Sequence, residues 1–149
     1  MNRVFLVAVL LAAYGSGAFA APCPGTQLSF AQITAALQGK TINANSPAGE
    51  NWNEIHCGTS GSTDNLQKVG LGVGHPVDPQ EKVGTWTVNV GATGVDTVTY
   101  NYGPGAIYTW RVFSTDTTID STLNNICWQA GGEAIATQTA AATQVGCLP

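Results

Sequence analysis

The sequence predicts an all-β fold, an antiparallel meander that closes into a small barrel of about eight strands with one short N-terminal helix. After residue 40, apolar and polar residues alternate with a period of two, and turns rich in glycine separate the runs. The turns between the last five runs are too short for the crossover that parallel strands need. Closure into a barrel removes the exposed edges of an open sheet.

Length and composition limit the class of protein. A chain of 149 residues is expected to form one domain. With 44% hydrophobic residues and a formal net charge of −4, the chain is too apolar and too weakly charged for a disordered protein. Only five residues are Lys or Arg, which gives no basic surface for nucleic acid. Nucleic acid is therefore not an expected partner.

The first twenty residues have the pattern of a secretory signal peptide. Arg3 precedes an apolar run from Val4 to Ala13, and Ala18-Phe19-Ala20 forms an A-x-A cleavage site. The run is about half the length that a transmembrane helix needs. We therefore expect residues 1–20 to be removed, leaving a single secreted or periplasmic domain over residues 21–149 with no membrane contact.

Four cysteines follow the predicted cleavage site, and an even number in an exported protein predicts two disulfides. Three pairings are open. We favour Cys23–Cys57 with Cys127–Cys147, which would tie each end of the chain to the body. No C-x-x-C or H-x-x-x-H pair is present, so we expect no metal and no cofactor.

The helix is expected near Ser29–Gln38. Ser29 and Gln32 have the spacing of a capping box, apolar residues recur on one helical face, and Gly39 stands where a helix ends. Eight strands are expected to follow, at Lys40–Asn45, Asn51–Cys57, Leu66–Gly70, Val83–Val90, Val95–Tyr102, Ala106–Phe113, Leu123–Gln129 and Glu133–Thr139.

Strand alternation places large aromatic side chains on one face of three consecutive runs. An eight-stranded barrel has room inside for its own side chains or for one small ligand. If a cavity exists, its wall is expected to consist of Trp86, Tyr100, Tyr102, Tyr108 and Trp110. Such a wall suits a flat, largely apolar ligand with one or two polar groups. The long segment from Gly70 to Lys82 would then close the mouth.

The triplet Gly84-Thr85-Trp86 on a predicted strand, in a small secreted chain of many strands, resembles the lipocalin-like (calycin) barrels. The resemblance implies an antiparallel barrel that holds a small apolar molecule. In lipocalins the triplet lies on the first strand and its Trp packs against an Arg. Here it lies mid-chain, and Arg111 is the only Arg after residue 20.

Three functions follow from these observations. The first is a secreted, non-catalytic binding module for a small apolar or aromatic ligand or for another secreted protein. The second is a small secreted hydrolase, because Glu54 and His56 alternate on one strand face as an acid–base pair would. No G-x-S-x-G nucleophile motif accompanies them, and we assign no catalytic residue. The third is a structural or inhibitory protein with a solid barrel.

Overall fold

A computed structural model describes residues 21–63, 65–116, 125–138 and 146–149. It contains one helix, α1 (Phe30–Leu37), among the residues described. The strands are β1 (Thr26–Gln27), β2 (Thr41–Asn45), β3 (Asn51–His56), β4 (Leu66–Lys68), β5 (Glu81–Asn89), β6 (Thr97–Asn101), β7 (Ile107–Ser114), β8 (Ile126–Ala130) and β9 (Glu133–Gln138).

The strands β2 to β9 form a closed antiparallel barrel. Each pairs with the next along the chain, and β9 returns to pair with β2 at Thr137 and Asn45. The prediction of an all-β, eight-stranded barrel with one short helix is therefore confirmed. All eight expected runs form strands, with ends shifted by a few residues. Residues 123, 124 and 139, which belong to the last two expected runs, lie outside the described residues.

Strand β1 was not expected, because two residues carry no periodic pattern. It pairs with Ser114 and Phe113 at the end of β7. The other edge of β7 is paired there with β8, so β1 occupies the edge that β6 leaves free. In this position β1 leads the chain directly into α1.

The helix α1 begins and ends where the sequence predicts. The Gln32 side chain accepts a hydrogen bond from the Ser29 N–H at 2.8 Å, and the Asp96 carboxylate accepts one from the Phe30 N–H at 2.6 Å. A carboxylate in this position also complements the positive end of the helix dipole. Gly39 takes φ +71° and donates its N–H to the His56 carbonyl, which ties the helix end to β3.

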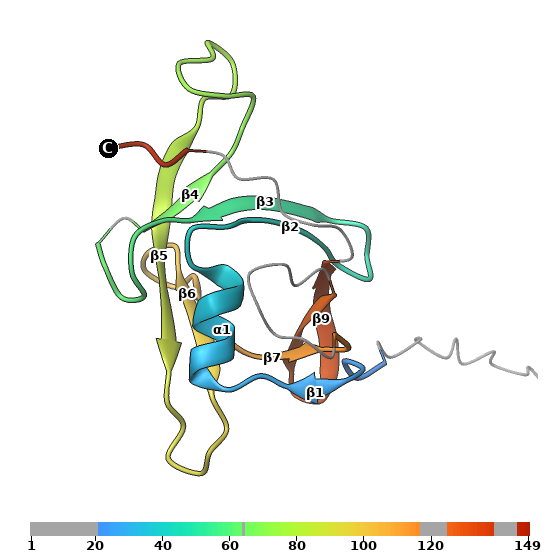
Figure 1. Cartoon of the computed structure of the whole chain (residues 1–149). Helices are drawn as coiled ribbons and strands as arrows, with labels where there is room; N and C mark the ends of the chain where they lie inside the picture. Colours follow the sequence, from blue (N-terminus) through green and yellow to red (C-terminus); the bar gives the residue numbers. More distant parts are fainter. Residues whose placement is uncertain (1–20, 64, 117–124, 139–145) are drawn as a thin grey trace, which may run out of the picture.

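The helix lies inside the ring of strands in the view of Figure 1. Its apolar face buries Ile33, Ala36 and Leu37 in the same core as Trp86 and Val98. We call one end of the barrel the mouth. It is formed by the turns at residues 46–50, 102–106 and 131–132. Since α1 and the core residues fill the other end, free space inside the barrel is found toward the mouth.

The disulfides join Cys23 to Cys127 and Cys57 to Cys147. The favoured pairing of Cys23 with Cys57 and of Cys127 with Cys147 is therefore wrong. The reason lies in the segment before β1: the Cys23 N–H donates to the Gln129 side chain of β8, and the Ala21 carbonyl accepts the Ala134 N–H of β9, which places Cys23 beside β8.

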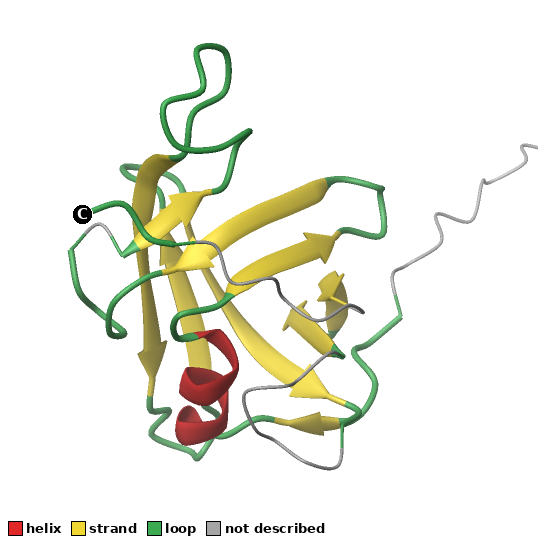
Figure 2. Cartoon of the chain, turned by 45° about the horizontal axis from the view of Figure 1, so that its top comes forward, coloured by secondary structure: helices red, strands yellow, loops and turns green. Residues whose placement is uncertain are grey.

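The second disulfide holds the C-terminal segment against the outside of the barrel. The Gln67 side chain of β4 accepts a hydrogen bond from the Leu148 N–H and donates one to the Leu148 carbonyl. Gln80 donates to the Gly146 carbonyl. Figure 2 shows this end of the chain beside the sheet. Cys147 is thereby placed next to Cys57 at the end of β3.

Two disulfides indicate an oxidising environment. In the part of the chain that the structure describes, no helix is long and apolar enough to span a bilayer.

Candidate functional site

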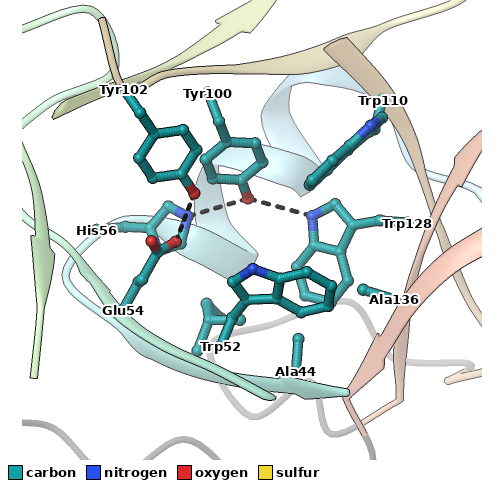
Figure 3. Close-up of a pocket in the computed structure, with 10 residues that line it drawn as sticks. Ala44, Trp52, Glu54, His56, Tyr100, Tyr102, Trp110, Trp128 and Ala136 are labelled. Atoms are coloured by element: carbon teal, nitrogen blue, oxygen red, sulfur yellow. Dashed lines mark hydrogen bonds between the residues drawn. The ribbon is translucent and has the colours of Figure 1, made fainter. Parts of the chain in front are cut away.

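Two adjoining cavities open at the mouth of the barrel. The outer cavity has a volume of about 540 Å³, which lies in the range of small-molecule sites, whereas the inner cavity of about 20 Å³ has room for about one water. Trp52, Tyr102 and Trp110 line both, so these three rings form the boundary between them. The inner cavity and its side chains are shown in Figure 3.

The strand pleat explains why these side chains meet. Along β3, alternate residues point inward, which places Trp52, Glu54 and His56 in a row from the mouth toward the core. Strands β6 and β7 face them, with Tyr100 paired in register with Tyr108. Because both strands direct their even-numbered residues inward, their aromatic rings form a continuous wall.

The rings of this wall contact one another. The centroids of Tyr100 and Trp110 are 5.3 Å apart, those of Tyr108 and Trp110 are 5.8 Å apart, and those of Tyr102 and Tyr108 are 6.2 Å apart. These spacings are typical of interacting aromatic pairs. The contacts hold the wall in place before any ligand arrives.

The described lining of the inner cavity carries one carboxyl group, that of Glu54. Tyr102 donates its hydroxyl proton to Glu54 Oε2 at 2.9 Å. Burial raises the pKa of Glu54 from its ordinary value of 4.5 to about 7, and the hydrogen bond from Tyr102 opposes part of this rise. Glu54 therefore changes its charge near neutral pH.

A second hydrogen-bond chain lies deeper. The Trp128 indole N–H donates to the Tyr100 hydroxyl oxygen at 3.1 Å, and that hydroxyl is 3.0 Å from His56 Nε2. Since the indole is only a donor, the tyrosine hydroxyl is free to donate its own proton to Nε2. His56 then carries its proton on Nδ1, which has no hydrogen-bond partner among the residues described.

Burial determines the protonation of this deeper chain. It lowers the pKa of His56 to about 3, and the nearby backbone of Lys40 opposes only part of this shift. Burial also raises the pKa of the Tyr100 and Tyr102 hydroxyls well above the ordinary value of 10. At neutral pH the imidazole is uncharged and both phenols are protonated, so Glu54 is the group that brings negative charge into the inner cavity.

The structure brings together four of the five residues predicted to line a ligand site. Tyr100 lines the inner cavity, Tyr108 lines the outer cavity, and Tyr102 and Trp110 line both. Trp86 lines neither. Its side chain is completely buried, its ring meets that of His56 edge to face at 5.3 Å, and its indole N–H donates to the Cys57 carbonyl. It faces the same way as Tyr100, its register partner, but it lies deeper in the barrel.

Several lining residues were not among the predicted ligand contacts, and Trp52, Trp128 and Glu50 illustrate the reasons. Trp52 shares the alternating β3 face with Glu54, so alternation alone was sufficient to place it inside. Trp128 lies two residues after Ile126 on β8, so the same alternation places both side chains inside the barrel. Glu50 stands in the β2–β3 turn, where periodicity predicts no direction for a side chain.

Glu54 and His56 do line one cavity, but each is bonded to a different tyrosine. A neutral, completely buried imidazole with a pKa near 3 is a weak base at neutral pH. The described lining of the inner cavity also contains no serine, threonine or cysteine side chain. The chemistry that this arrangement supports best is reversible binding.

The loop between β4 and β5, residues 69–80, projects away from the barrel (Figure 1). All its residues are described, and none lines either cavity. His75 Nδ1 accepts the N–H groups of Val77 and Asp78, while Lys68 bonds to Asp78 at 2.9 Å and Glu81 at 3.3 Å. These contacts give the polar side chains of the loop a structural role.

Comparisons of the chain with models of known protein families, with curated proteins and with solved structures found no match.

Proposed function

We propose that this protein is a non-catalytic binding module that holds a small, flat, largely apolar ligand at the mouth of its barrel. The observation that carries the proposal is the outer cavity of about 540 Å³, walled by Trp52, Tyr102, Tyr108 and Trp110. None of these four rings is completely buried, and the Tyr108 side chain is 46% exposed. Covering such aromatic surface with a ligand is favourable because it removes apolar area from water.

We also propose that the protein is exported, with residues 1–20 acting as a cleaved signal peptide, to a periplasmic or extracellular destination. Residues 1–20 lie outside the described residues, and the support comes from the two disulfides. An exported binding module would meet its ligand outside the cytoplasm.

The lipocalin-like resemblance is part of the same proposal. Support comes from the up-and-down order of eight strands around one barrel. Gly84 of the triplet lies so close to β6 that an added Cβ would be 2.2 Å from the Asn101 carbonyl oxygen, so glycine is needed there. Arg111 differs from the family pattern: it lies over the Phe113 ring and not against Trp86.

The test is a titration of the folded protein with the uncharged fluorescent probe N-phenyl-1-naphthylamine. We expect probe fluorescence to rise on binding and Trp110→Ala to weaken the affinity about tenfold, as loss of a central aromatic anchor does. Tyr108→Ala should weaken it by a smaller factor because its ring is partly exposed.

Ile107→Ala is the matched control. Ile107 precedes Tyr108 on β7, is 59% exposed and points to the outer face, so its removal should leave the affinity unchanged. Absence of binding by the unmodified protein, or equal binding by all three variants, would contradict the proposal and favour a structural or protein-binding role for the barrel.

A further inference from the structure

The two cavities have an uneven charge distribution. Glu50 lines the outer cavity and Glu54 lines the inner one, while no Lys or Arg is among the described lining residues of either. The basic side chain nearest in register is Lys68, the β4 partner of Glu54. Its ammonium bonds instead to Asp78 and Glu81. An anionic ligand would meet no positive group here.

Aromatic faces fill the space between the two carboxyl groups. Trp52, Tyr102 and Trp110 stand around the inner cavity together with Glu54, as Figure 3 shows, and the same three rings also line the outer cavity. The faces of indole and phenol rings carry negative charge density and attract organic cations within about 6 Å, most strongly where water is excluded. Aromatic rings combined with a carboxylate are thus a suitable environment for an alkylammonium group.

Resting on the proposed function, we infer that the ligand of this site is an organic cation, an amine or quaternary ammonium attached to an apolar body. Its apolar part occupies the outer cavity against Tyr108 and Trp110, and its charged end points past Trp52 and Tyr102 toward Glu54 in the inner cavity. The inner cavity of about 20 Å³ has room for one water between the ammonium and the deeper polar groups.

The surroundings of Glu54 are consistent with this role. From the turn after β6, Tyr102 donates a hydrogen bond to one carboxylate oxygen, and Tyr100 of β6 faces the same cavity as a neutral phenol. On β3 itself, His56 is neutral, and on β4 the charge of Lys68 is balanced by Asp78 and Glu81. The residue opposite on β2 is apolar Ile42. No neighbour described here competes with a ligand cation for the Glu54 charge.

Three probes with one phenyl body and different ends test the inference: 2-phenylethylammonium, 2-phenylethanol and 3-phenylpropanoate. Binding to the folded protein is followed by calorimetry at physiological ionic strength. We expect the ammonium to bind about tenfold more tightly than the alcohol, and the carboxylate to bind most weakly. Affinity for the ammonium should fall as the pH drops below about 7, where Glu54 becomes protonated.

Matched variants locate the charge effect. Glu54→Gln keeps the shape of the side chain and should reduce the tenfold preference for the ammonium over the alcohol to less than about threefold. Glu50→Gln, at the exposed rim, should reduce it by a smaller factor. Glu133→Gln changes the net charge by the same amount at a residue that lines neither cavity, so the preference should persist.

The outcomes separate the two proposals. Equal affinity for the ammonium and the alcohol, with N-phenyl-1-naphthylamine still bound, would overturn the cation inference and leave the binding function standing. A preference for the ammonium that survives Glu54→Gln and Glu50→Gln together would also overturn it. If neither the naphthylamine nor any phenyl probe binds, both proposals fail.

Discussion

Glu54 is a carboxyl group held in an environment that disfavours its charge. It lies on β3 among Trp52, Tyr102 and Trp110 and receives one hydrogen bond, from Tyr102. Folding therefore raises its pKa to about 7 from the value of 4.5 that an unfolded chain would show. Above that pKa the ionised carboxylate destabilises the folded state, because burial disfavours its charge.

The pH dependence of stability tests this environment. Below the unfolded pKa both states hold the proton, and between pH 4.5 and about 7 the folded protein holds it while the unfolded chain releases it. The folded state thus loses stability as the pH rises through this window, by roughly 3 kcal/mol in total. Glu54→Gln removes the effect, so the variant should match the unmodified protein near pH 4 and exceed it by about that amount near pH 8.

Urea unfolding followed by tryptophan fluorescence measures both proteins at each pH. His56 acts in the opposite direction, since its pKa is lowered to about 3 and its contribution is lost as the pH falls below 6.5. It is present in both proteins and cancels in the difference. A constant difference between the two proteins from pH 4 to pH 8 would show that Glu54 is solvated and ionised normally.

At the scale of elements, β4 is too short for its neighbour. It has three residues and β5 has nine, so the backbone of β5 beyond Gly84 lacks a strand partner on that side. The Asn65 side chain substitutes for one: its carbonyl accepts the Trp86 N–H at 2.8 Å and its amide donates to the Trp86 carbonyl at 3.0 Å. Ser60 accepts the Val88 N–H at 2.6 Å. The loop before β4 thus completes the sheet with side chains.

Asn65→Ala should therefore destabilise the barrel. It leaves the buried Trp86 N–H without a partner and removes the bond from Asn65 to the Thr59 carbonyl, and we expect a loss of about 2–3 kcal/mol in the free energy of unfolding. Ser62→Ala is the control in the same loop, because its bond to Thr59 is exposed, and the expected change is below about 0.5 kcal/mol. Equal effects of the two substitutions in denaturant unfolding would disprove the role assigned to Asn65.

At the scale of the whole molecule, the disulfides connect parts of the chain that are far apart in sequence. They span 104 residues between Cys23 and Cys127, and 90 residues between Cys57 and Cys147. In the chain-entropy model, a loop of this size stabilises the folded state by about 4–5 kcal/mol. Each end of the chain is thereby fastened to a strand of the closed barrel.

Peptide mapping without reduction checks this connectivity. Trypsin cuts after Lys40, Lys68 and Arg111. A second protease that cuts after glutamate separates Cys127 from Cys147 at Glu133. We expect the peptide ending at Lys40 to be joined to residues 112–133, and the peptide holding Cys57 to be joined to residues 134–149. A species joining the Cys23 and Cys57 peptides would contradict the pairing.

Local patterns were sufficient for much of this molecule. The period of two located eight strands, and Ser29, Gln32 and Gly39 located the ends of α1, because each of these signals depends on residues next to one another in sequence. Alternation also placed Tyr100, Tyr102, Tyr108 and Trp110 on one inward face. For Trp86 the predicted face is correct, but alternation says nothing of depth along the barrel, which decides between a cavity wall and the core.

The sequence by itself determined the fold class, the order of the strands and the aromatic character of the barrel interior, since strand pleat and turn chemistry are local properties. Only the tertiary structure decided the disulfide pairing, through the contacts of the segment before β1 with β8 and β9, and the position of the open space at the mouth. It alone brought Glu54 into one cavity with aromatic side chains of β3, β6, β7 and β8. Burial and register depend on contacts between residues distant in sequence, and such contacts determine whether a carboxyl group is solvated or poised to receive a cation.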